Sequence, residues 1–187
     1  MVLPMNANTN GQVLPKHITL LQCGLRWDAQ PETELDLDMA VLALTATGKL
    51  AAGKEGLIYA GHPRHSSGAI QLLNDSITGE GDGDDEQLVI HLLQLPVDIT
   101  KLLFVVNIDC GEEQHQDFSQ TPNACWRLLD RSSQRVLLNR SLSNAQWQNV
   151  TTLFVATLER TVDQWQIVSC LEPSSLRNLH DLLHQYS

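Results

Sequence analysis

Short apolar segments rich in Leu, Val and Ile recur along the chain, and turn residues separate them. Segments of this length at intervals of about ten residues are typical of an all-β fold, either a sandwich or a barrel. The pattern predicts about ten strands, at 17–26, 36–46, 56–60, 69–73, 87–93, 101–109, 124–130, 134–141, 150–160 and 164–171.

The last residues of the chain follow a different period. Leu176, Leu179, Leu182 and Leu183 recur at the spacing of one helix face, after a start signal at 173–175, Pro-Ser-Ser. We therefore expect a short C-terminal helix whose apolar side covers the β-sheet core.

Length and charge limit the class of protein. A chain of 187 residues normally makes one domain, so we expect a single domain over 1–187, with a loosely ordered N-terminal segment at 1–15. A net charge of -10 and a pI near 5.0 argue against nucleic acid as a partner. Without a leader-like start or a long apolar run, the sequence predicts a cytoplasmic protein.

The four cysteines are far apart and form no CxxC pair, which argues against a zinc knuckle or a disulfide scaffold. We expect them to be reduced core residues. They are Cys23, Cys110, Cys125 and Cys170.

The segment 74–86, NDSITGEGDGDDE, concentrates six carboxylates and three glycines in thirteen residues. Such a loop resists compaction by charge repulsion, whereas a hard cation such as calcium takes six to eight oxygens, roughly 2.3–2.6 Å away. The glycines allow the backbone to turn carbonyls and side chains inward. A solvated acidic turn or linker is the alternative, and the spacing does not fit an EF-hand.

A second acidic pair, Asp36 and Asp38, opens a predicted strand. Side chains two residues apart lie on one face of a strand, roughly 6–7 Å from each other, so two carboxylates can flank one ion. A solvated strand end is the alternative. If the fold brings 28–38 beside 74–86, the excess charge favours two ions over one.

With these features in view, the chain resembles the TerD family of tellurium-resistance and general stress proteins. The motifs that carry the resemblance follow the family's order and spacing over nearly the whole chain. They are CGLRWDA (23–29), LDLDMAVLAL (35–44), NDSITGEGDGDDE (74–86), LLFVVNI (102–108), NACWRLLD (123–130) and LHDLLHQYS (179–187).

The resemblance implies a β-sandwich of two antiparallel sheets and two bound calcium ions. It implies ligand roles for the acidic residues of both segments, with three further candidates: the Asp of the RWD motif, a threonine hydroxyl and a glycine carbonyl. The acidic residues with an implied ligand role are Asp36, Asp38, Asp75, Asp82, Asp84, Asp85 and Glu86, and the further candidates are Asp28, Thr78 and Gly79.

The sequence departs from the family pattern in three regions. The segment between Trp27 and Asp36 is shorter and lacks a glycine, and Ser76 occupies a position where an amide or acid is usual. The residues that follow the strand predicted at 101–109 also differ, at 109–111 and 114–119. These changes bear on the ligand set and on partner recognition.

The function implied is that of a non-enzymatic, calcium-binding stress-response protein, whose ordered acidic loops bind other stress or tellurium-resistance proteins. No nucleophile elbow, P-loop, GxGxxG or HExxH motif occurs. The alternatives are a metal-dependent phosphoesterase or nucleotide-processing enzyme, and a calcium-dependent module that associates peripherally with membranes.

Two histidine pairs also have the spacing of candidate ligands. His180 and His184 lie one helical turn apart and could share a transition metal, but a polar helix face is the more common explanation. His62 and His65 flank a turn, where we expect a solvated loop.

Overall fold

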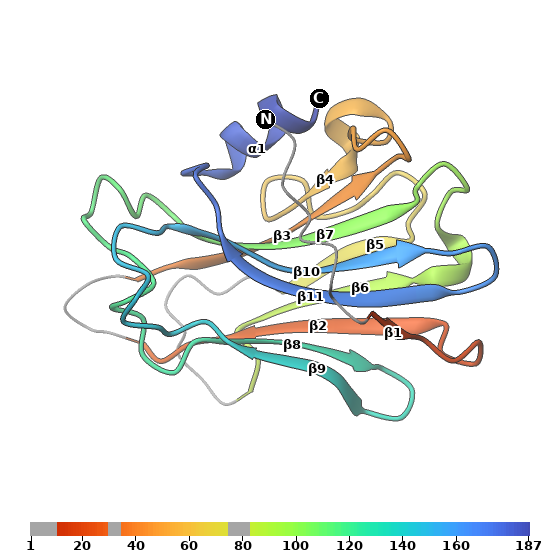
Figure 1. Cartoon of the computed structure of the whole chain (residues 1–187), viewed down its shortest axis with the longest axis horizontal. Helices are drawn as coiled ribbons and strands as arrows, with labels where there is room; N and C mark the ends of the chain where they lie inside the picture. Colours follow the sequence, from red (N-terminus) through yellow and green to blue (C-terminus); the bar gives the residue numbers. More distant parts are fainter. Residues whose placement is uncertain (1–10, 30–34, 75–82) are drawn as a thin grey trace.

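The described part of the chain, residues 11–29, 35–74 and 83–187 of a computed structural model, forms a sandwich of two antiparallel sheets (Figure 1). The six-stranded sheet has the order β1-β11-β10-β7-β3-β4, and the five-stranded sheet has the order β5-β6-β2-β8-β9. The strands are β1 (Gln12–Val13), β2 (Leu20–Arg26), β3 (Leu37–Leu44), β4 (Leu57–Ile58), β5 (Ile70–Asn74), β6 (Glu86–His91), β7 (Lys101–Ile108), β8 (Cys125–Asp130), β9 (Arg135–Ser141), β10 (Thr152–Arg160) and β11 (Trp165–Pro173). The predicted sandwich is confirmed.

Each of the ten predicted segments overlaps a strand. The eleventh, β1, was not predicted, because two residues are too short for a visible alternation. It pairs with β11 through Gln12 and Ile167, and it falls inside the segment 1–15 that we expected to be loosely ordered. Residues 1–10 of that segment lie outside the described part.

The main core lies between the two sheets. In β3, Leu37, Met39 and Val41 point into this core, whereas Ala40 and Leu42 belong to a second apolar cluster. That second cluster lies on the outer face of the six-stranded sheet. β3 is therefore apolar on both sides, except at its first residues.

The second cluster is covered by the C-terminal helix α1 (Leu179–Tyr186), as Figure 1 shows. Leu182 and Tyr186 are buried against the sheet. Asn178 caps the helix by accepting a hydrogen bond from the Asp181 backbone N–H at 2.9 Å. The predicted helix is confirmed, although Leu176 precedes it and packs on the cluster from outside the helix.

Two short 3-10 helices, η1 (Gly53–Gly56) and η2 (Leu92–Gln94), connect strands. Within the described ranges, no helix is long and apolar enough to cross a membrane.

The four cysteines are free thiols, but only one is a fully buried core residue. Cys23 is buried, Cys125 and Cys170 are half-buried, and Cys110 is exposed. The core interpretation is therefore wrong for Cys110, which lies in the turn after β7. Its thiol donates to Asp109 at 3.4 Å, and this hydrogen bond raises the Cys110 pKa.

Seven acidic residues of the described part of the chain lie in or next to the strand ends at one end of the sandwich, the end at the left of Figure 1. Here β2 and β7 end while β3, β6 and β8 begin. Hydrogen bonds join the two layers at this end, among them those from Trp27 Nε1 to the Leu35 carbonyl at 3.2 Å and from the Met39 N–H to Glu86 Oε2 at 2.7 Å. We call this end of the sandwich the acidic end and define it by Asp28, Asp36, Asp38, Asp84, Asp85, Glu86 and Asp109.

Candidate metal centre

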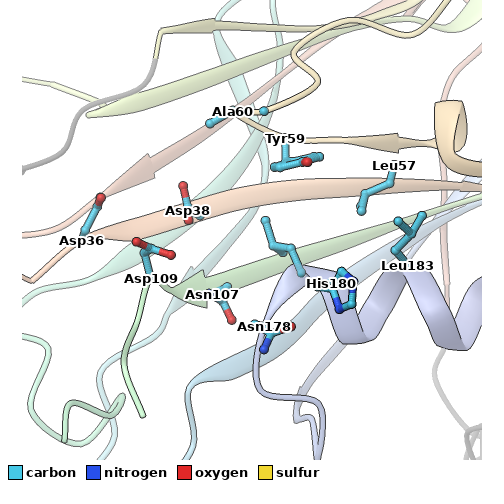
Figure 2. Close-up of a pocket in the computed structure, with 12 residues that line it drawn as sticks. Asp36, Asp38, Leu57, Tyr59, Ala60, Asn107, Asp109, Asn178, His180 and Leu183 are labelled. Atoms are coloured by element: carbon cyan, nitrogen blue, oxygen red, sulfur yellow. The ribbon is translucent and has the colours of Figure 1, made fainter. Parts of the chain in front are cut away.

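Asp36 and Asp38 face the outer side of the six-stranded sheet, because the residues that alternate with them, Leu37 and Met39, enter the main core. The predicted shared face is confirmed, and Figure 2 shows both side chains on the same side of β3. Asp109, at the end of the neighbouring strand, joins them. Its backbone N–H donates to the Asp36 carbonyl at 2.9 Å.

These three carboxylates form one wall of a pocket of about 420 Å³, which we call the acidic pocket. The rest of the pocket is lined mainly by β4 and its following turn and by α1, including Leu57 and His180 (Figure 2). The pocket is therefore acidic at one side and apolar at the other. A ligand that enters it meets carboxylate oxygens beside aliphatic surface.

Asn107 lies between the acidic wall and α1, and its amide is held by the protein. Its Oδ1 accepts from Thr152 Oγ1 at 2.7 Å, and its Nδ2 donates to the Ile108 carbonyl at 2.9 Å. Asn107 is buried, and it is the cross-strand neighbour of Asp38. These two hydrogen bonds fix the orientation of the Asn107 amide in the lining of the pocket.

Asp84 behaves differently from the residues of the acidic pocket. Both of its carboxylate oxygens pair with Arg127, at 2.8 Å to Nε and 2.9 Å to the guanidinium terminus, and only 3% of its side chain is exposed. The carboxylate lies directly over Gly24, where an added Cβ would come within 2.1 Å of it. Gly24 and Arg127 are cross-strand neighbours in the five-stranded sheet.

The Asp84 carboxylate thus lies on the outer face of the five-stranded sheet, because Cys23 and Leu25 on either side of Gly24 point into the main core. Asp36 and Asp38 lie on the outer face of the other sheet. In this arrangement one ion cannot contact both Asp84 and Asp38.

Asp85 and Glu86 are buried at the junction of the two sheets. Asp85 Oδ2 accepts from the Trp27 N–H at 3.0 Å. Burial raises the Asp85 pKa, and the hydrogen bond from Trp27 partly offsets this effect. Glu86 accepts from the Met39 N–H. The short strand β4 pairs only with Val41 and Leu42 of β3 and does not reach Met39. Both carboxylates therefore complete backbone hydrogen bonding where strand pairing stops.

Asp28 lies at the end of β2 and accepts a hydrogen bond from Asn123 Nδ2 at 2.6 Å. Four of the predicted ligands, Asp75, Thr78, Gly79 and Asp82, lie outside the described residues. Within the described ranges, no group of three or more His, Cys, Asp or Glu side chains is arranged to hold a metal ion. The metal-ligand roles remain predictions.

Sequence reasoning missed Arg127, Asn107 and Asp109 as parts of this end. For Arg127 the available signal was Gly24, because a glycine inside a strand indicates close approach by another group. For Asp109 the available signal was its position directly after the buried strand β7, which pairs with β3.

The class of protein follows from this geometry: a two-sheet sandwich with carboxylates concentrated where its strand ends meet. The chain matches the TerD domain over residues 3–186. It therefore belongs to the TerD family, whose named members include tellurium-resistance and stress-response proteins.

Individual relatives support this assignment. The chain is 36% identical over 153 residues to stress response protein SCP2 of Bacillus subtilis (strain 168), covering 81% of this chain and 75% of the relative. It is 32% identical over 145 residues to tellurium resistance protein TerD of Serratia marcescens, covering 76% and 74%. The crystal structure of a telluride resistance protein (TerD) homologue from Streptomyces coelicolor A3(2) matches with a TM-score of 0.73 at 19% identity, covering 90% of this chain and 98% of that one, and shows the same fold.

Proposed function

We propose that this protein is a non-enzymatic calcium-binding member of the TerD family. Two calcium ions bound at the acidic end order the acidic segments there into a surface for other stress or tellurium-resistance proteins. The observation that carries the proposal is the position of Asp36, Asp38 and Asp109 around one pocket. They lie at the end of the sandwich where β6 begins, at the last residue of the acidic segment 74–86.

The donor chemistry of the acidic pocket fits a hard cation. Its acidic wall offers carboxylate oxygens from Asp36, Asp38 and Asp109, and calcium takes oxygen ligands from side chains, backbone and water. A bound ion would supply positive charge that offsets repulsion among these carboxylates. A net charge of -10 makes that compensation favourable for folding.

The shape of the pocket supports a partner-binding role. Leu57 and Leu183 add apolar surface beside the carboxylates, and α1 forms a wall that does not belong to the sheets. Pockets that combine apolar lining with a few polar groups are typical of binding sites. We propose that partners contact this side of the acidic end once the ions are bound.

The proposal is tested by thermal unfolding with excess calcium and with excess chelator. An ion that binds only the folded state stabilises it by RT ln(1 + [L]/Kd), which is about 2.7 kcal/mol at 100 times Kd. We expect a higher melting temperature with calcium and a much smaller rise with magnesium at equal ionic strength. Equal melting temperatures in calcium and in chelator would contradict the proposal.

A further inference from the structure

Two exposed histidines on α1 point their ring nitrogens at each other. His180 and His184 lie one turn apart, and their Nε2 atoms are 3.2 Å from each other. The rings are nearly perpendicular, with centroids 4.4 Å apart and an interplanar angle of 80°. The two Nε2 atoms therefore lie close enough together at the surface to contact the same ion or to share a proton.

The separation of the two nitrogens matches a chelate. Zinc binds histidine nitrogen at about 2.0–2.1 Å, and two such bonds to atoms 3.2 Å apart enclose an angle of roughly 100–105° at the metal. This value lies between the octahedral and the tetrahedral angle. The same pair can share a proton in the absence of metal, with one Nε2 donating to the other.

We propose that His180 and His184 form a binding site for a transition-metal ion of the zinc, nickel or copper class. The two imidazoles occupy two coordination positions. In the described part of the chain, no third His, Cys, Asp or Glu side chain completes the group. Water or a ligand from another molecule fills the remaining positions.

This site differs in chemistry from the proposed calcium site. Imidazole nitrogen suits zinc, nickel and copper, whereas carboxylate and carbonyl oxygens suit calcium. The two sites are nevertheless neighbours, because His180 also lines the acidic pocket (Figure 2). Since nitrogen donors define it, the inference does not depend on calcium binding.

A metal bound across this turn acts on the helix itself. α1 has only eight residues, and helices of this length are marginal unless other contacts hold them. The Tyr186 carbonyl of α1 accepts from the Leu50 N–H at 2.7 Å, which joins the helix to the sheet region. A chelate between His180 and His184 would therefore fix α1, and with it one wall of the acidic pocket.

The test is titration of the untagged full chain with Cu²⁺ and with Zn²⁺ in saturating calcium, so that the acidic segments are already occupied. We expect one ion per chain, bound more tightly for copper than for zinc. His180→Gln and His184→Gln should each weaken binding by about tenfold or more, because one of two ligands is lost. The matched control is His17→Gln, which changes an exposed histidine elsewhere and should leave the affinity unaltered.

Two further readouts identify the ligands and the effect on the helix. The electron paramagnetic resonance spectrum of the copper complex should show coupling to nitrogen, and His180→Gln should reduce it. Amide exchange of α1 and of Leu50 should slow with zinc in the wild type and stay unchanged in His180→Gln. Equal affinity in wild type and both α1 variants, or a copper spectrum without nitrogen coupling, would overturn the inference.

Discussion

The acidic end contains two sets of carboxylates, which differ in burial and in hydrogen bonding. Asp84, Asp85 and Glu86 are consecutive and almost fully buried, and they receive hydrogen bonds from Arg127, Trp27 and Met39. By contrast, Asp36 and Asp38 are partly exposed, Asp109 is exposed, and all three line the acidic pocket.

From this difference we expect the buried set to act mainly on stability and the pocket set mainly on ligand binding. Glu86 joins the two sheets, and Asp84 and Asp85 complete hydrogen bonds within the five-stranded sheet and at its edge, so removal of the buried set should destabilise the fold. The pocket set lies on a surface, so its removal should change binding more than stability.

The largest expected effect comes from Glu86→Ala. The change leaves the Met39 N–H buried without its acceptor and removes packing at a side chain that is 1% exposed. We expect a loss of about 3 kcal/mol in the free energy of unfolding, measured by urea denaturation in chelator. The control Glu113→Ala alters an exposed carboxylate and should cost little. Similar losses for the two variants would remove the distinction between the sets.

A smaller effect is expected from Arg127→Ala, which leaves the buried Asp84 carboxylate without its paired guanidinium. Because Arg127 itself is 38% exposed, we expect a loss of about 2 kcal/mol, below the range for fully buried pairs. Asp84→Asn combined with Arg127→Ala should cost less than the sum of the single changes. Additive costs in this double-mutant cycle would show that the pair contributes no coupling.

The smallest effect concerns a carboxylate at the other end of β8. Hydrogen bonds from Ser133, and then from the Ser132 N–H, lower the Asp130 pKa. A lowered pKa stabilises the fold above the unfolded value of about 3.9, and this stability is lost as the pH falls through the folded value. Ser133→Ala should therefore cost about 1 kcal/mol at pH 7 and progressively less below pH 4. A cost independent of pH would contradict the assigned cause.

Most of the fold could be predicted because the strands of a sandwich show their pattern locally. β3, for example, begins directly after Asp36 and is apolar at every residue except Asp38. In contrast, β1 is only two residues long and is defined by pairing with Gln166 and Ile167, far along the chain. Such a strand has no local signal.

The site could be predicted only in part. Strand alternation correctly placed Asp36 and Asp38 on one face, because that inference needs no partner strand. The direction of Asp84 could not be inferred, since it depends on Arg127, which comes from a strand 43 positions later. The charge of a loop can be counted from the sequence, but the donors that neutralise it come from tertiary contacts.

The most direct test of the proposed function is calorimetric titration of the chelator-treated protein with calcium. We predict two bound ions for the wild type, because the excess of carboxylates at this end favours more than one. Asp38→Asn should remove or strongly weaken at least one of them. The matched control is Asp163→Asn, which changes an exposed aspartate in the turn between β10 and β11. This variant should bind calcium as the wild type does. Absence of calcium binding by the wild type, or wild-type binding by Asp38→Asn, would contradict the account.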